Sequence, residues 1–118
     1  MEINKIAVIG GGTMGNGIAH VFALKGIDVF LTEMNEDFYN RALNTISGNL
    51  DRQVKKQIIL DDEKNKILTK IQKVIGIEKI PSYVQLVIEA IYENKDAKLS
   101  IFKHLEKQLN PECIFASN

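Results

Sequence analysis

The stretch that decides the fold is Lys5–Gly15, which reads KIAVIGGGTMG. It opens with a short apolar run of the kind that forms a buried strand, and its glycines match the pattern G-x-G-x-x-G. Apolar residues at helical spacing follow the last glycine. We therefore predict a strand at 5–9, a tight turn and a helix at 14–24, the arrangement of a dinucleotide-binding βα unit.

Three glycines of this turn have separate physical tasks. Gly10 lets the chain leave the strand sharply, because glycine tolerates backbone angles that are closed to other residues. Gly12 leaves the backbone open to a pyrophosphate, which the N–H groups at the helix start favour, and Gly15 allows close packing of helix and sheet. The alternative is a glycine-rich turn with no ligand. The predicted pyrophosphate-binding residues are Gly10, Gly11, Gly12, Thr13, Met14 and Gly15.

Glu33 ends a second predicted strand, at 28–32, and lies about 20 residues beyond the glycine turn, where a carboxylate can accept hydrogen bonds from ribose hydroxyls. A 2′-phosphate would be repelled there, and no Arg or Lys follows among Met34, Asn35 and Glu36. These residues favour NAD over NADP. The alternative is an acid near a helix N-terminus that binds no ligand.

Composition indicates an ordinary globular domain. The 118 residues are 45% hydrophobic, and 15 basic residues balance 15 acidic ones, so neither a nucleic acid nor a membrane surface is an expected partner. Cys113 is the single cysteine, which excludes an internal disulfide, and we expect a buried structural thiol. The chain enters a strand almost at once, so we expect no signal peptide and a cytoplasmic location.

A helical pair is predicted between the second and third strands. Apolar residues recur at helical spacing from Tyr39 to Val54, and after a break at 60–62 the residues Ile67, Leu68 and Ile71 predict a second helix. Further strands are predicted at 73–77, 84–88 and 113–116. A helix before the last strand is predicted to bury Leu99, Phe102, Leu105 and Leu109. The expected fold class is α/β, a Rossmann-type doubly wound parallel sheet with this helical pair inserted.

Three segments carry a family resemblance: Val8–Ala19, Val87–Asn94 and Ile114–Asn118. In this order and spacing, the chain resembles the N-terminal domain of 3-hydroxyacyl-CoA dehydrogenases, including the bacterial 3-hydroxybutyryl-CoA dehydrogenases. The glycine turn alone would also suit dehydrogenases of the 3-hydroxyisobutyrate and 6-phosphogluconate type. The helical pair favours the hydroxyacyl-CoA group.

The resemblance implies further binding residues. Glu93 and Lys98 match positions that contact the nicotinamide half of NAD, and Asn118 matches a position close to the nicotinamide. Lys56 falls where the family has a basic residue against the phosphates of coenzyme A. Asn49 falls where relatives can carry a serine that touches the same group. The alternative for Lys56 is a solvated helix surface.

The resemblance also implies an activity, the oxidation of the 3-hydroxyl of an acyl-CoA substrate such as 3-hydroxybutyryl-CoA to a 3-keto group, with hydride transfer to NAD, in fatty-acid and butanoate metabolism. The family's catalytic histidine and its partner glutamate come after the position of residue 118. Residues 1–118 are therefore expected to be a truncated NAD-binding domain that lacks the helical catalytic and dimerisation domain and is not catalytic alone. The whole protein is expected to be a homodimer or a higher homo-oligomer.

His20 and His104 are expected to be ordinary helix residues, and neither has a partner at metal-ligand spacing, so no metal site is predicted. Glu89 is expected to be structural. One functional alternative from another class is a stand-alone NAD-binding module that regulates without catalysis.

Overall fold

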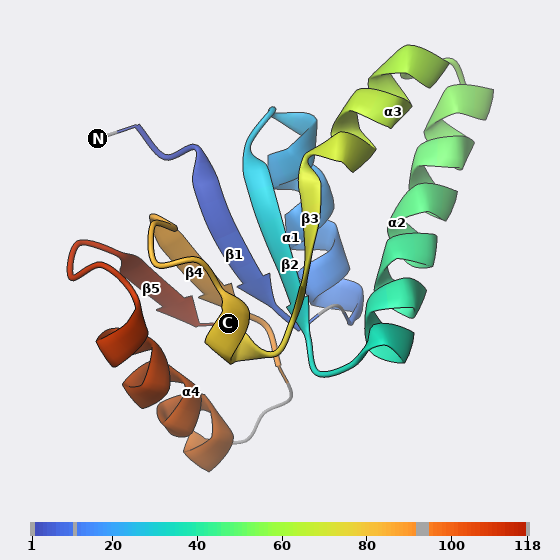
Figure 1. Cartoon of the computed structure of the whole chain (residues 1–118). Helices are drawn as coiled ribbons and strands as arrows, with labels where there is room; N and C mark the ends of the chain where they lie inside the picture. Colours follow the sequence, from blue (N-terminus) through green and yellow to red (C-terminus); the bar gives the residue numbers. More distant parts are fainter. Residues whose placement is uncertain (1, 11, 92–94, 118) are drawn as a thin grey trace.

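The computed structural model describes residues 2–10, 12–91 and 95–117, and its centre is a parallel sheet (Figure 1). The spatial order of the strands is β3-β2-β1-β4-β5, so the chain moves outward from β1 on one side and then crosses to the other. This order confirms the predicted doubly wound parallel sheet. The strands are β1 (Lys5–Ile9), β2 (Asp28–Glu33), β3 (Ile71–Ile75), β4 (Leu86–Glu89) and β5 (Ile114–Ser117).

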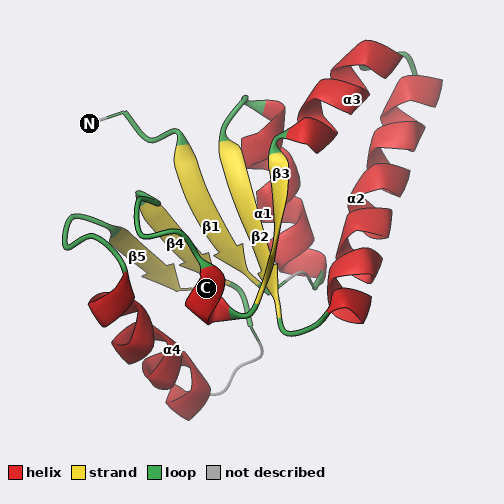
Figure 2. Ribbon diagram, in the orientation of Figure 1, coloured by secondary structure: helices red, strands yellow, loops and turns green. Residues whose placement is uncertain are grey.

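Helices cover both faces of the sheet (Figure 2). One face carries α1 (Thr13–Leu24), α2 (Glu36–Lys55) and α3 (Asp61–Thr69), and the other carries α4 (Lys95–Gln108) and a short 3-10 helix, η1 (Ile77–Lys79). The predicted helical pair between the second and third strands is therefore confirmed as α2 and α3.

The central strand β1 is buried on both faces. Ile6 and Val8 belong to the apolar cluster under α1, α2 and α3, whereas Ala7 and Ile9 belong to the cluster under α4. All four side chains are at most 4% exposed. Full burial of a side chain such as Ile6 contributes about 1.5–3 kcal/mol, so this strand anchors both halves of the core.

The third strand begins at Ile71 rather than at residue 73, and the prediction that Ile71 is helical was wrong. Helix α3 ends at Thr69, and the carbonyl of Lys70 already accepts a hydrogen bond from the N–H of Val29 at 2.8 Å. Hydrogen bonding to β2 therefore begins the third strand two residues earlier than the apolar pattern indicated. Ile77, predicted as the end of the strand, lies in η1.

The fourth strand begins at Leu86 rather than at residue 84, and the fifth spans Ile114–Ser117 rather than 113–116. The predicted apolar face of α4 is only partly correct. Leu105 is fully buried, but Leu99 is 49% exposed. Six residues at 3.6 per turn place Leu99 about 120° around the helix from Leu105, so the two cannot share one face.

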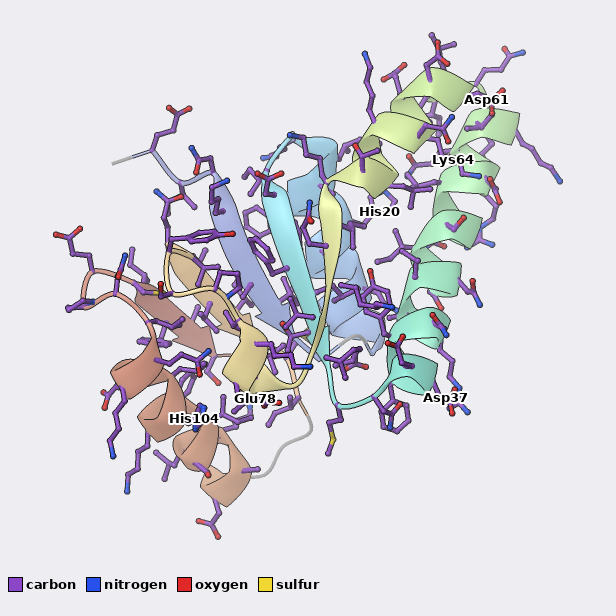
Figure 3. The ribbon with its side chains drawn as sticks, in the orientation of Figure 1. His20, Asp37, Asp61, Lys64, Glu78 and His104 are labelled. Atoms are coloured by element: carbon purple, nitrogen blue, oxygen red, sulfur yellow. The ribbon has the colours of Figure 1, made fainter. Side chains whose placement is uncertain are left out.

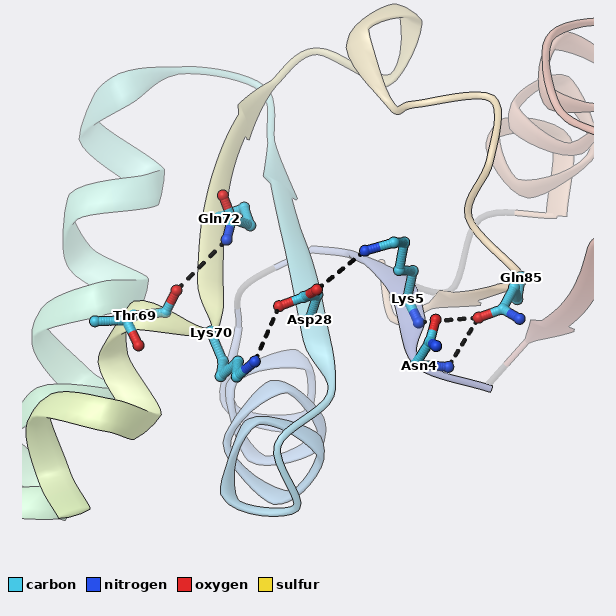
Figure 4. A network of polar contacts seen from close by, with 7 residues as sticks. All are labelled: Asn4, Lys5, Asp28, Thr69, Lys70, Gln72 and Gln85. Atoms are coloured by element: carbon cyan, nitrogen blue, oxygen red, sulfur yellow. Dashed lines mark hydrogen bonds and ion pairs between the residues drawn. The ribbon is translucent and has the colours of Figure 1, made fainter. Parts of the chain in front are cut away.

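A polar network ties the amino ends of the strands together (Figure 4). The Asp28 carboxylate lies 3.1 Å from the Lys5 ammonium and 3.6 Å from that of Lys70. The Gln85 side-chain oxygen accepts hydrogen bonds from the backbone N–H groups of Asn4 and Lys5. This network lies at the opposite end of the sheet from the glycine turn, and it aligns β1 with its neighbours there.

Among the described residues, no helix combines the length and the apolar character that a membrane crossing requires.

Candidate dinucleotide-binding site

The glycine turn lies at the carboxyl edge of the sheet, where all the parallel strands end together. Gly10 follows β1 directly with a positive φ of 95°, and its N–H donates to the carbonyl of Thr32 in β2 at 2.9 Å. On its other side, a Cβ at Gly10 would lie 3.0 Å from the carbonyl oxygen of Ala90, just after β4. The turn is therefore fixed between β2 and β4, at the point where the sheet's winding changes direction and ligands bind in such folds.

Gly15 permits the first turn of α1 to touch the end of β1. A Cβ on Gly15 would lie 1.7 Å from the carbonyl oxygen of Gly10, far inside van der Waals contact. This contact confirms the close helix–strand approach that the pattern predicted. The same close approach places the start of α1 at the carboxyl edge of the sheet.

The start of α1 fits an anionic group. Its N-cap is Gly12, which makes no side-chain capping hydrogen bond, and no acidic residue occupies the first turn of the helix. A Cβ at Gly12 would meet nothing within 4 Å, so the space in front of the backbone is open. Open, uncapped N–H groups at a helix start suit a pyrophosphate. Met14 is 56% exposed beside them, and the predicted residue Gly11 lies outside the described residues.

Glu33 is the last residue of β2 and lies beside the glycine turn. Its neighbour Thr32 accepts the Gly10 hydrogen bond, and its own carbonyl accepts from the N–H of Gly76 at 2.8 Å. Its side chain is only partly buried. Asn35, not Glu33, is the N-cap of α2, since its side-chain oxygen accepts from the N–H of Phe38 at 2.9 Å. Glu33 is therefore a strand-end carboxylate, as a ribose-binding residue should be.

The other side of the turn, beyond β4 and β5, holds a group of polar side chains. Lys98 of α4 lies with its ammonium 3.4 Å from the carboxylate of Glu89, the last residue of β4. Ser117, the last residue of β5, donates to the same carboxylate at 2.7 Å. Glu93 and Asn118, predicted to contact the nicotinamide half of the cofactor, lie outside the described residues.

Asn49 and Lys56 both line one pocket of about 550 Å³ between α1 and α2. Its lining is Gly17, His20, Val21, Leu24, Asn49, Arg52, Gln53, Lys56 and Ile58. Arg52 was missed by the sequence reasoning, although its spacing of three and four residues from Asn49 and Lys56 places all three on one helix face. Arg52 also donates a hydrogen bond to the side-chain oxygen of Asn49.

The two histidines lie apart from the glycine turn (Figure 3). His20 lines the α1–α2 pocket, where burial lowers the pKa of its imidazole. His104 is exposed on α4 and shares a hydrogen bond of 3.0 Å with Gln108. Cys113 is buried, as predicted, and burial raises the pKa of its thiol. Across the described part of the chain, no three His, Cys, Asp or Glu side chains are placed to hold a metal ion.

Similarity to solved structures extends over nearly the whole chain. The (S)-3-hydroxybutyryl-CoA dehydrogenase of Ralstonia eutropha superposes with a TM-score of 0.93 at 31% identity, over 99% of this chain and 41% of that one. The 3-hydroxybutyryl-CoA dehydrogenase of Escherichia coli superposes with a TM-score of 0.95 at 30% identity, over 100% of this chain and 25% of that one.

Sequence comparison gives the same result. A 3-hydroxybutyryl-CoA dehydrogenase of Bradyrhizobium diazoefficiens is 43% identical over 98% of this chain, which spans 39% of that relative's length. The family model that matches residues 5–118 is that of the NAD binding domain of 3-hydroxyacyl-CoA dehydrogenase. Since this match includes the glycine turn, Glu33 and every strand, the chain belongs to the 3-hydroxyacyl-CoA dehydrogenase family and carries its NAD-binding domain.

Proposed function

We propose that this domain holds NAD for a dehydrogenase that oxidises the 3-hydroxyl of a 3-hydroxyacyl-CoA, with 3-hydroxybutyryl-CoA as the substrate. The observation that supports it most directly is the open, uncapped start of α1 at Gly12, placed between the ends of β2 and β4. When bound, NAD would accept the hydride that leaves the substrate's 3-carbon. The family match makes a stand-alone regulatory module or a 3-hydroxyisobutyrate-type dehydrogenase the less favoured alternatives.

The residues of the carboxyl edge have distinct proposed roles. The turn from Gly10 to Gly15 holds the pyrophosphate, and Glu33 accepts hydrogen bonds from the adenosine ribose. Lys98, together with Glu93 and Asn118, contacts the nicotinamide half. These roles follow the direction of the dinucleotide across the sheet, from β2 over β1 to β4 and β5.

The proton of the 3-hydroxyl requires a base within hydrogen-bond reach. Both histidines of the chain lie on helices away from the carboxyl edge, one in the α1–α2 pocket and one exposed on α4. We therefore assign proton transfer to residues outside 1–118, in a helical catalytic and dimerisation domain of a homo-oligomer. A cytoplasmic location is proposed with it.

Replacing Glu33 with alanine tests the cofactor assignment. We expect the affinity for NADH to fall about tenfold or more, because hydrogen bonds from hydroxyls to a carboxylate contribute about 1.5–3 kcal/mol. The unaltered chain should prefer NADH to NADPH, and the variant should lose most of this preference. Isothermal titration with both cofactors measures the two effects.

Glu36→Ala is the matched control, since Glu36 carries the same charge three residues away but lies in the first turn of α2, where it pairs with Lys73. It should leave the affinity for NADH nearly unchanged. Equal losses from the two variants would contradict a specific ribose contact at Glu33.

The α1–α2 pocket is proposed to take the phosphates of coenzyme A through Lys56 and Asn49. Replacing Lys56 with methionine should weaken CoA binding about fivefold and leave NADH binding unchanged, because one charge-assisted contact is lost. Lys55→Met is the control, since Lys55 is exposed next to Lys56 and does not line the pocket. Equal losses of CoA affinity from both variants would show that the effect comes from general surface charge rather than from a contact in the pocket.

A further inference from the structure

The carboxyl end of β4 holds a buried acid that the proposed function does not use. Glu89 is 0% exposed, the most buried ionisable side chain among the described residues. Transfer of a carboxylate from water into a protein interior is costly unless charged and hydrogen-bonding partners surround it. The position of those partners therefore indicates what the acid is for.

The partners of Glu89 come from three different segments. One carboxylate oxygen accepts from the N–H of Ile91 at 2.5 Å, two residues after the end of β4. The other accepts from the hydroxyl of Ser117 at 2.7 Å, at the end of β5, and lies 3.4 Å from the ammonium of Lys98 in α4. The Lys98 side chain is only 14% exposed. A single carboxylate thus links the end of β4, the end of β5 and the first half of α4.

This group lies beside the glycine turn. Glu89 is the register partner of Ile9, the residue before Gly10, and Ser117 is the register partner of Glu89. Glu33 lies on the opposite side of β1, at the end of β2. A dinucleotide with its pyrophosphate at the turn and one ribose at Glu33 must extend its other half over β4 and β5, where Glu89 lies.

Stability alone is a weak explanation for such a group. Replacing a buried ion pair with well-packed apolar residues is often neutral or stabilising, because desolvation offsets most of the Coulomb attraction. A carboxylate with three directed partners instead fixes geometry. It holds the Lys98 ammonium and the Ser117 hydroxyl in defined positions relative to the glycine turn.

We propose that Glu89 is a positioning residue for the nicotinamide half of the cofactor, through its contacts with Lys98 and Ser117. This inference rests on the proposed function, because it needs the dinucleotide in the stated direction. Glu89 does not touch the cofactor. It fixes the side chains against which the nicotinamide ring lies, and the ADP-ribose part of the cofactor is bound without its help.

The test compares NADH with ADP-ribose, a ligand that lacks the nicotinamide ring. The variant Glu89→Gln keeps the size of the side chain and removes the charge that faces Lys98. We expect NADH affinity to fall about tenfold and ADP-ribose affinity to stay within about twofold of the unaltered chain. Glu106→Gln is the control, an exposed acid on α4, and should change neither affinity. A purely structural role would lower both affinities together, through a smaller folded fraction.

A double-variant cycle tests the path through Lys98. If Glu89 acts by holding Lys98, adding Glu89→Gln to Lys98→Met should cause little further loss of NADH affinity. If Glu89→Gln shows no cooperative thermal unfolding, the single variant Ser117→Ala carries the test, because Ser117 has no proposed contact with the cofactor and acts only through Glu89. It should then lower NADH affinity at least threefold with ADP-ribose affinity unchanged.

The outcomes separate this inference from the function on which it rests. If the unaltered chain binds neither NADH nor ADP-ribose, the proposed function fails. If the unaltered chain binds both and Glu89→Gln changes their affinities equally or not at all, the positioning role is overturned. Full additivity in the cycle also contradicts it, because independent losses exclude action through Lys98.

Discussion

Replacing Gly15 with alanine is expected to lower the free energy of unfolding by at least about 3 kcal/mol. The new Cβ would lie 1.7 Å from the carbonyl oxygen of Gly10 and 2.8 Å from its carbonyl carbon. Both atoms are backbone, so no side-chain rotation relieves the overlap. Either the start of α1 moves off the sheet or Gly10 leaves its position between β2 and β4. Urea unfolding followed by circular dichroism should show a lower midpoint with an unchanged slope.

The control is Gly48→Ala, another glycine-to-alanine change inside a helix. A Cβ there meets only the Arg52 guanidinium, at an ordinary 3.9 Å. Because alanine is a better helix former than glycine, the free energy of unfolding of this variant should rise by about 0.5–1 kcal/mol. An equally stable or more stable Gly15→Ala protein would contradict the close approach of α1 to β1.

The parts of the fold that the sequence predicted correctly depend on local signals. β1 and the glycine turn carry their own pattern within a few residues, and the helical spacing from Tyr39 to Val54 lies within α2. The start of β3 was predicted wrongly because it depends on a distant partner. The hydrogen bond from Val29 to Lys70 decides where that strand begins, and no local apolar pattern contains it.

The candidate site shows the same division. The positions of Gly12, Gly15 and Glu33 at the carboxyl edge could be predicted from spacing, because the motif encodes the geometry of a single βαβ unit. The group around Glu89 could not, since Ser117 lies 28 residues away and reaches it only through the pairing of β4 with β5. Arg52 could have been predicted from the sequence as a third residue of this helix face, because helical spacing alone places it beside Asn49 and Lys56.

Replacing Gly12 with valine is expected to abolish cofactor binding while the fold survives. The residue has an extended backbone, with φ −65° and ψ −174°, that valine can adopt. A Cβ there meets nothing within 4 Å, and glycine supplies no side-chain cap that could be lost. The free energy of unfolding should therefore change by less than about 1 kcal/mol. In titrations, NADH affinity should fall at least about 100-fold, or about 2.7 kcal/mol.

The physical reason is that the pyrophosphate is expected to occupy the open space in front of Gly12. A side chain there excludes the ligand without disturbing the packing of the protein. A valine side chain would stand between the pyrophosphate and the N–H groups at the start of α1, whose attraction acts over one helical turn. ADP-ribose should lose as much affinity as NADH, because both carry the pyrophosphate, and Gly12→Ala should show a smaller loss of the same kind. A Gly12→Val protein that unfolds normally and still binds NADH would place the cofactor elsewhere. If Gly12→Val lowers the affinities for NADH and ADP-ribose equally, and Glu89→Gln lowers only the affinity for NADH, the pyrophosphate and the nicotinamide bind at separate parts of the carboxyl edge.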